Sequence, residues 1–390
     1  NSPRGGGIYS AGTVSITNSG LLTVYDATSE DDTTTNDVVT NGDFEQINAT
    51  TGTPSLSIQG DIATSVAGEI SIECPTTLTG NVRLSTDTGT GRILFANTAT
   101  INGDANGTRD LVVRCGSGNA FFGATAGAGN GQIGNTGRPR SIAVYTAGAP
   151  STLTVQFYGD VSVQQAAGSD AFYFNGRNLT FDNALTANTG NVTIQNTGTL
   201  TTSPSTASTN GTITLSASGA KFDQTTTNPM SLGANVVTND GTIDFKGPAT
   251  LTAGIQISAG TGNVTFGNSS TISGAYALTV NSSGATTFNG SVGAVPLTPL
   301  ASIETNAGGT TRINGGAIST AGAQTYNDAI IIGTQAATIT ETDNALTVRF
   351  LSTVDGDYPL TLNATGAATF SGAVGSTLNS TNGFGPTSGI

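Results

Sequence analysis

An eighteen-residue stretch, YALTVNSSGATTFNGSVG (residues 276–293), has a near copy, YPLTLNATGAATFSGAVG, at residues 358–375. The two copies start 82 positions apart. In each copy, apolar and small polar residues alternate on both sides of a glycine. Alternation with a period of two predicts strands with one buried face, and the glycine predicts a turn between them. We therefore interpret the stretch as a repeated structural module.

A shorter unit, a glycine followed by alternating residues, recurs through the chain. It reads GNVTI, GTITL, GTIDF, GNVTF and GATTF, beginning at Gly190, Gly211, Gly241, Gly262 and Gly284. Successive glycines of this series are separated by 21, 30, 21 and 22 positions. The shorter step leaves too little chain for a β-α-β unit, which needs about 30 residues, and no helical periodicity lies between the glycines. The spacing instead predicts a coil that winds once per step.

The predicted fold is all-β, a parallel β-helix or β-solenoid with about 21 residues per coil and outward loops. Each strand pairs in parallel with its equivalent one coil later, about 4.8 Å away. In the resulting apolar column, Val264 and Phe266 lie over Ile243 and Phe245. The offset between the two copies of the module corresponds to about four coils. Glycines at the corners are expected to supply positive φ angles.

The expected organisation is a single elongated β-helix over residues 1–390 that contains the repeated module. Two regions fit the alternation poorly: the acidic residues 25–45 and the glycine-rich residues 116–150. We predict that both are excursions from the coil. A further outward loop is expected around residues 221–230, inside the longest step between glycines.

Composition and charge exclude several classes of protein. Charged residues make up 9% of the chain, so the solvated faces must be hydroxyl and amide groups, as in extracellular proteins. A net charge of −13 repels nucleic acid and anionic lipid. Apolar runs are far shorter than the roughly 20 residues that cross a bilayer, so no membrane insertion is expected. We expect an extracellular or cell-surface location.

Cys74 and Cys115 are the only cysteines. They lie 41 positions apart in the chain, which is close to two coils. Two coils place their Cα atoms about 10 Å apart, beyond the reach of a disulfide. An oversized intervening coil would allow the two to pair. A disulfide and two buried thiols both remain open on the spacing alone.

Candidate chemistry is sparse, because the chain has no histidine to serve as general base or zinc ligand. Residues 129–134 match G-x-G-x-x-G, but no helix is predicted after them, as a dinucleotide site requires. Paired carboxylates are the remaining common catalytic device. The close pairs Asp31 with Asp32 and Asp355 with Asp357 lie in an acidic run and in a turn, so we predict no enzyme and no cofactor.

Two binding hypotheses rest on single features. The acidic run could collect calcium through Asp26, Asp31 and Asp32, although it lacks the usual calcium-loop spacing, and a solvated face is the simpler explanation. Exposed aromatic residues could stack on sugar rings, but alternation in AFYFNG turns two of its three aromatic residues inward. The aromatic candidates are Phe121, Phe122, Phe172, Tyr173 and Phe174.

The repeated module, together with NAGGTTRINGGAISTAGAQTYNDAIIIG (residues 306–333), resembles the β-strand repeats of giant bacterial surface proteins. These are the filamentous-haemagglutinin-like exoproteins and autotransporter passengers, and the likeness is clearest over residues 190–375. The resemblance implies a right-handed β-helix, secretion to the cell surface, and adhesive or scaffolding roles. It transfers no catalytic residue.

We therefore expect a non-enzymatic extracellular structural protein, a rod that serves as a filament, sheath, surface-layer or adhesin subunit. Its copies are expected to associate head to tail, because open solenoid ends invite pairing. The alternative explanation for open ends is a fragment of a longer array of coils. Surface glycans or host cells are further candidate partners. The alternative is a carbohydrate-binding or polysaccharide-cleaving β-helix of the tailspike or lyase type, which predicts carboxylates that project together from one lateral groove of the rod.

Overall fold

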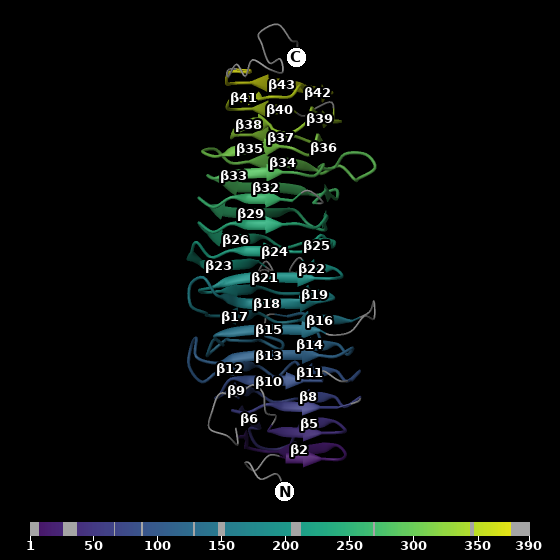
Figure 1. Cartoon of the computed structure of the whole chain (residues 1–390), viewed down its shortest axis with the longest axis vertical. Coiled ribbons are helices and arrows are strands. Elements are labelled where there is room, and N and C mark those ends of the chain that lie inside the picture. Colours follow the sequence, from purple (N-terminus) through teal and green to yellow (C-terminus); the bar gives the residue numbers. More distant parts are fainter. Residues whose placement is uncertain are drawn as a thin grey trace. The chain divides into compact units, whose positions relative to one another are not determined.

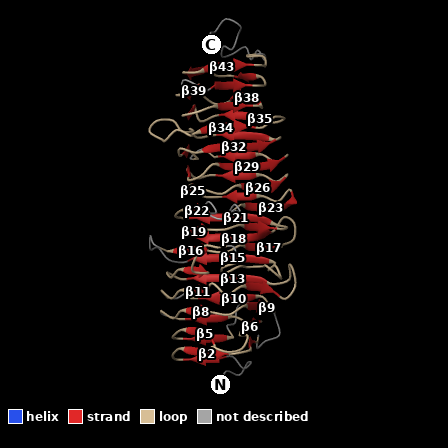
Figure 2. Cartoon of the chain, turned by 180° about the vertical axis from the view of Figure 1, so that it is seen from behind, coloured by secondary structure: helices blue, strands red, loops and turns tan. Residues whose placement is uncertain are grey.

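The computed structural model describes residues 8–25, 37–65, 67–86, 89–127, 129–146, 153–203, 212–267, 270–343 and 347–375. These residues form 43 strands and no helix, as Figure 2 shows in red, so no helical segment among them could cross a membrane. The chain divides into two compact units, Asn1–Ser216 (unit 1) and Ala217–Ile390 (unit 2). Within each unit the strands stack coil upon coil (Figure 1).

Each full coil contributes one strand to each of three faces, named A, B and C in chain order. In unit 1, face A consists of β1 (Ile8–Ser10), β4 (Val38–Thr40), β7 (Ile62–Thr64), β10 (Val82–Ser85), β13 (Asp110–Cys115), β15 (Ser141–Thr146), β18 (Asp170–Gly176) and β21 (Asn191–Asn196). Face B consists of β2 (Val14–Asn18), β5 (Phe44–Asn48), β8 (Ile70–Ile72), β11 (Ile93–Phe95), β14 (Ala120–Phe122), β16 (Thr154–Phe157), β19 (Asn178–Phe181) and β22 (Leu200–Thr202). Face C consists of β3 (Leu21–Val24), β6 (Ser55–Ile58), β9 (Thr76–Leu78), β12 (Ile101–Gly103), β17 (Val161–Val163) and β20 (Leu185–Ala187). β23 (Ile213–Ser218) also belongs to face C, and the division between the two units falls within it.

Unit 2 is built in the same way. Its face A consists of β24 (Phe222–Gln224), β27 (Ile243–Phe245), β30 (Val264–Phe266), β33 (Ala285–Phe288), β35 (Thr310–Ile313), β38 (Ala329–Ile332) and β41 (Val354–Gly356). Face B consists of β25 (Met230–Leu232), β28 (Ala249–Leu251), β31 (Ile272–Ser273), β36 (Ala317–Thr320), β39 (Ala337–Glu341) and β42 (Leu360–Ala364). Face C consists of β26 (Val236–Asn239), β29 (Ile255–Gly260), β32 (Ala277–Ser282), β34 (Ser302–Thr305), β37 (Gln324–Tyr326), β40 (Thr347–Phe350) and β43 (Ala367–Phe370).

The predicted parallel β-helix is confirmed, because neighbouring strands on each face pair in parallel with the strand one coil away. Alternation sends every second side chain inward, where the coils above and below cover it. The predicted row is also confirmed: Val264 and Phe266 pair with Ile243 and Phe245. Phe288 extends that row, and its ring lies 5.3 Å from the ring of Phe266. Stacked phenylalanines therefore form part of the core of unit 2.

Coil length varies more than the sequence spacing predicted. Ile243 pairs with Val264, 21 positions later, as expected. In unit 1, Leu111 pairs with Ile142, 31 positions later. The predicted step therefore underestimates the larger coils of unit 1, where long corner loops join strands that still stack in register.

The two copies of the repeated module lie on different faces. The first copy supplies β32 on face C and β33 on face A, whereas the second supplies β42 on face B and β43 on face C. Its offset is therefore three and two-thirds coils, not about four. The core contact is the same in both, since Phe288 stacks on Phe266 and Phe370 stacks on Phe350. What repeats is a corner with two strands, and it fits more than one corner of the coil.

The expected excursions are wrong over their described residues. Residues 26–36 lie outside the described part, but β4 and β5 follow directly and Phe44 is fully buried. Residues 116–150 contain β14 and β15, and Ile133 bridges Ile101 and Val161 on face C. The described residues of both regions therefore include core strands as well as the turns between them.

The outward loop predicted around residues 221–230 is also wrong. That region contains β24 and the start of β25, whose inward side chains Phe222 and Met230 are buried. The prediction treated the 30-residue step from Gly211 to Gly241 as one coil with an extra loop. The strand after Gly211 lies on face C, however, and the strand after Gly241 lies on face A. The step therefore spans more than one coil.

Several glycines that precede strands stack on one another, and close approach explains them better than a positive φ. A Cβ atom on Gly91 would lie 1.8 Å from the carbonyl oxygen of Gly68, and one on Gly118 would lie 1.9 Å from that of Gly91. In unit 2, a Cβ on Gly262 would lie 2.1 Å from the carbonyl oxygen of Gly241. None of these glycines has a positive φ. Only glycine lets consecutive coils approach this closely at the corner.

Candidate functional site

Two carboxylates lie side by side on the outer surface of face A in unit 2. Asp223 in β24 pairs in register with Asp244 in β27. In both strands the flanking residues are buried and the aspartate is not, so both side chains point outward. Strand spacing places their backbones about 4.8 Å apart. The polysaccharide-cleaving alternative predicted carboxylates that project together from a lateral groove, and Asp223 and Asp244 meet the first half of that prediction, at residues other than the predicted ones.

The electrostatics of the pair are asymmetric. Burial raises the pKa of Asp244, and the charge of Asp223 raises it further, while Lys246 acts in the opposite direction. Lys246 Nζ lies 3.8 Å from Asp223 Oδ1. A carboxyl group with a raised pKa beside a second carboxylate can act as general acid in glycoside hydrolysis. The ammonium group can equally make the pair a neutralised surface cluster.

The pair was detectable from the sequence. KFDQ (221–224) and TIDF (242–245) place an aspartate at the outward position of equivalent strands, 21 positions apart. The predicted carboxylate pairs, Asp31 with Asp32 and Asp355 with Asp357, are instead close in the chain. In a solenoid, residues one coil apart are the spatial neighbours.

A second group of outward side chains lies on face A of unit 1, in two neighbouring register columns. Arg114 pairs in register with Tyr145, whereas Tyr173 is in register with Ala143 and meets Tyr145 diagonally. Arg114, Tyr145, Tyr173 and Gln195 come from β13, β15, β18 and β21. The guanidinium carbon of Arg114 lies 5.2 Å from the centre of the Tyr145 ring. The rings of Tyr145 and Tyr173 are 5.5 Å apart and tilted by 45°, and the Tyr173 hydroxyl donates to Gln195 Oε1 at 3.1 Å. We call these four residues the aromatic row.

The predicted orientation of the AFYFNG aromatics is confirmed. Phe172 and Phe174 are fully buried, whereas Tyr173 points outward. Phe122 is also fully buried, while Phe121 is half-buried on face B, with its ring 6.4 Å from that of Tyr158. Of the five predicted candidates, Phe121 and Tyr173 are therefore the ones that reach the surface.

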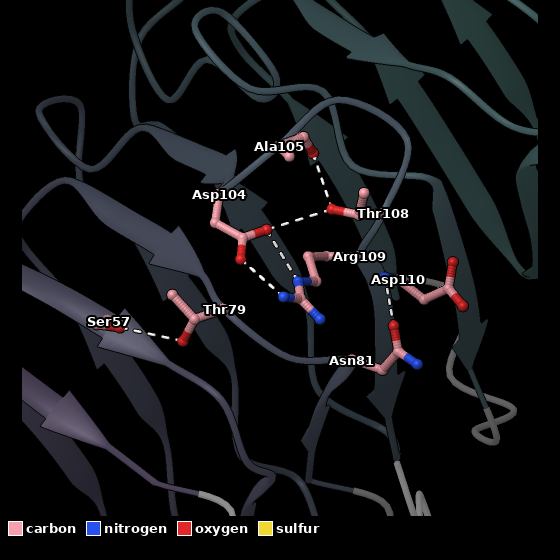
Figure 3. A network of polar contacts seen from close by, with 8 residues as sticks. All are labelled: Ser57, Thr79, Asn81, Asp104, Ala105, Thr108, Arg109 and Asp110. Atoms are coloured by element: carbon pink, nitrogen blue, oxygen red, sulfur yellow. Dashed lines mark hydrogen bonds and ion pairs between the residues drawn. The ribbon is translucent and has the colours of Figure 1, made fainter.

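Arginines around residues 104–140 are engaged in contacts within the protein. Arg109 donates to both carboxylate oxygens of Asp104 at 2.9 and 2.7 Å, and this hydrogen bonding lowers the pKa of Asp104 (Figure 3). Arg140 Nε donates to Asp110 Oδ1 at 2.9 Å, and Arg138 Nε donates to Ser162 Oγ at 3.0 Å. These contacts hold the long corner loops of unit 1 against the coil. Arg109 and Arg140 are balanced by carboxylates, whereas Arg138 donates to a neutral hydroxyl.

Among the described residues, the other predicted sites are placed as follows. The calcium candidates Asp26, Asp31 and Asp32 lie outside the described residues, and the described residues contain no group of three or more potential metal ligands. Asp355 lies in β41, where its carboxylate accepts a hydrogen bond from the Gly356 amide, as in a turn. The G-x-G-x-x-G match (residues 129–134) contributes a bridge on face C, with no helix in the described part of the chain.

The structure contains no disulfide between Cys74 and Cys115; both are buried thiols. Cys74 lies at the corner between β8 and β9, whereas Cys115 ends β13 two coils further on. Two coils correspond to about 10 Å along the stack, too far for a disulfide. Burial raises the pKa of the Cys74 thiol to about 11, which makes it a poor nucleophile at neutral pH.

Comparison of the chain with protein-family models, with curated proteins and with solved structures found no match.

Proposed function

We propose that the chain is a non-enzymatic extracellular structural protein, a β-solenoid subunit of a filament, sheath, surface layer or adhesin. The fold supports this function, because a stack of coils holds its core by neighbour contacts alone and is suited to length. Surfaces rich in hydroxyl and amide groups and the resemblance to filamentous-haemagglutinin-like repeats favour an extracellular location. As first expected, the copies associate end to end.

The observation that supports end-to-end association is the exposure of inward-facing side chains in the first and last described coils. Val14 in β2 is half-buried, although Phe44, its register partner one coil further in, is fully buried. Leu362 in β42 is likewise half-buried above the fully buried Ile339. Edge strands with partly exposed apolar side chains are templates for pairing with another chain. A further coil from a second copy would cover them.

The test is a charged substitution on the edge strand β42. Leu362→Lys places an ammonium group on its inward side, while the matched control Thr361→Lys places the same group on its exposed outer side. Sedimentation velocity and negative-stain microscopy over a range of concentrations should show linear oligomers for the wild type and the control. Leu362→Lys should remain monomeric. Dispersed monomers of the wild type at every concentration would refute the proposal.

A second candidate function is polysaccharide cleavage, which the juxtaposition of Asp223 and Asp244 favours. It predicts the release of reducing ends, or of unsaturated ends, from at least one polysaccharide in a panel. That release should vanish in Asp244→Asn and survive in Asp240→Asn, a change to an aspartate outside the pair. A wild-type chain that releases neither kind of end supports the structural proposal.

A further inference from the structure

We propose that the aromatic row of unit 1 binds a neutral polysaccharide chain that runs along face A across successive coils. The site is independent of end-to-end association and of the Asp223–Asp244 pair. Its four members, Arg114, Tyr145, Tyr173 and Gln195, come from four consecutive coils. Three strand spacings make the row about 14 Å long, an extended track suited to a chain and not to a single small molecule.

The first argument is that the row is ordered before any ligand binds. The guanidinium group of Arg114 lies over the Tyr145 ring, and the Tyr173 hydroxyl is held by Gln195. The two tyrosine rings contact each other between these ends. Tyrosine loses little conformational entropy on binding, and side chains already held in place lose less.

The second argument is the size of the neighbouring side chains. Val112 and Ala143 share a register column with Tyr173, next to the column that holds Arg114, Tyr145 and Gln195. Val112 and Ala143 are both half-buried and much shorter than the tyrosines. The tyrosine rings therefore project above these short side chains. A ligand that contacts the rings can also contact the lower surface formed by Val112 and Ala143.

The third argument is charge. Next to the short side chains, Arg140 and Asp110 form an ion pair, and Ser141 Oγ donates to Asp110 Oδ1 at 2.7 Å. These groups offer hydrogen-bond donors and acceptors together with nearly balanced charge. Sugar hydroxyls both donate and accept, and the apolar faces of pyranose rings match aromatic rings. A net charge of −13 disfavours a polyanion, so the ligand chemistry that fits is a neutral glycan.

The test uses affinity gel electrophoresis of the full chain in gels that contain a neutral glucan, a neutral mannan, or alginate as an acidic chain. The double variant Tyr145→Ala, Tyr173→Ala removes both rings. Thr265→Ala, on the outer surface of face A in unit 2, is the matched control. The double variant should bind the neutral glycan about tenfold more weakly, a loss of about 1.4 kcal/mol. Thermal unfolding of all variants shows whether the fold is retained.

Retardation of the wild type by at least one neutral chain, lost in the double variant and kept in Thr265→Ala, supports the proposal. Several outcomes overturn it: no retardation by either neutral chain, retardation by alginate alone, or a folded double variant that binds like the wild type. A double variant that changes the sedimentation of the protein without glycan would identify the row as a contact between copies, which also overturns it. None of these results depends on whether the wild type forms filaments.

Discussion

Removing one ring from the phenylalanine column of unit 2 tests the stacked core directly. Phe266 is 2% exposed, and its ring lies 5.3 Å from Phe245 on one side and 5.3 Å from Phe288 on the other. Phe266→Ala removes a buried aromatic side chain, which costs about 3–5 kcal/mol of unfolding free energy. Because both neighbouring rings lose a partner and few atoms can collapse into the gap, we expect a value near the upper end.

Phe222→Ala is the matched control, because Phe222 is equally buried at 1% exposure but contacts one ring in unit 2, that of Phe245 at 5.4 Å. The difference between the two variants isolates one ring contact, so Phe266→Ala should lose about 1 kcal/mol more. Phe266→Leu keeps most of the apolar volume and should lose less than either.

The assay is urea unfolding followed by far-ultraviolet circular dichroism, with hydrogen exchange to locate the loss. In a nearest-neighbour stack, the amides of β27, β30 and β33 should exchange faster in Phe266→Ala, while distant coils change little. If Phe266→Ala costs no more than Phe222→Ala, ring stacking adds nothing to burial. A loss below about 1 kcal/mol would mean that Phe266 is not a core residue, and the register would be wrong.

Three further predictions concern single features of the fold. Gly91→Ala should unfold at a clearly lower urea concentration than the wild type, because the added Cβ would lie 1.8 Å from a backbone oxygen of the neighbouring coil. Gly129→Ala is the control: it has nothing within 4 Å of the added atom and should unfold like the wild type. Burial and Asp223 raise the pKa of Asp244, so the folded state retains a proton that the unfolded chain has lost. Unfolding free energy should therefore fall as the pH rises from the ordinary aspartate pKa through the raised one, and Asp244→Asn should flatten that part of the pH profile. Cys74 should not react with a thiol reagent at neutral pH in the native protein, because burial raises its pKa to about 11. It should react once urea unfolds the chain. Rapid labelling of the native protein would contradict the buried position.

Much of the local structure was predictable from the sequence. Alternation specifies strand faces, which is why the inward positions of Phe172 and Phe174 and the pairing of Phe245 with Phe266 agree with prediction. The scarcity of helix-forming patterns and the regular spacing of the glycines before strands indicated parallel coils. Alternation depends on residues close in the chain, and the glycine spacing depends on a nearly constant interval. Both can therefore be recognised in the sequence alone.

The candidate sites were less predictable, because they join residues from different coils. Asp223 and Asp244 become neighbours only through register. Tyr145 in β15 meets Tyr173 in β18, although β16 and β17 lie between these two strands in the chain. When the coil lengths are unknown, only aspartates that are close in the chain, such as Asp31 and Asp32, can be predicted to lie close together in space. The coils of unit 1 differ in length, as the long coil between Leu111 and Ile142 shows, so the spacing of glycines does not give the coil lengths there.

The sequence by itself determined that the chain forms strands, which side of each strand is buried, and that small residues mark the corners. Tertiary structure decided which face each strand joins: the repeated module occupies faces C and A in one copy and B and C in the other. The physical reason is that a strand with one apolar side is equally satisfied on any of the three faces. Loop length and the close contacts of stacked glycines, both properties of neighbouring coils, then select the register and the outward side chains that meet.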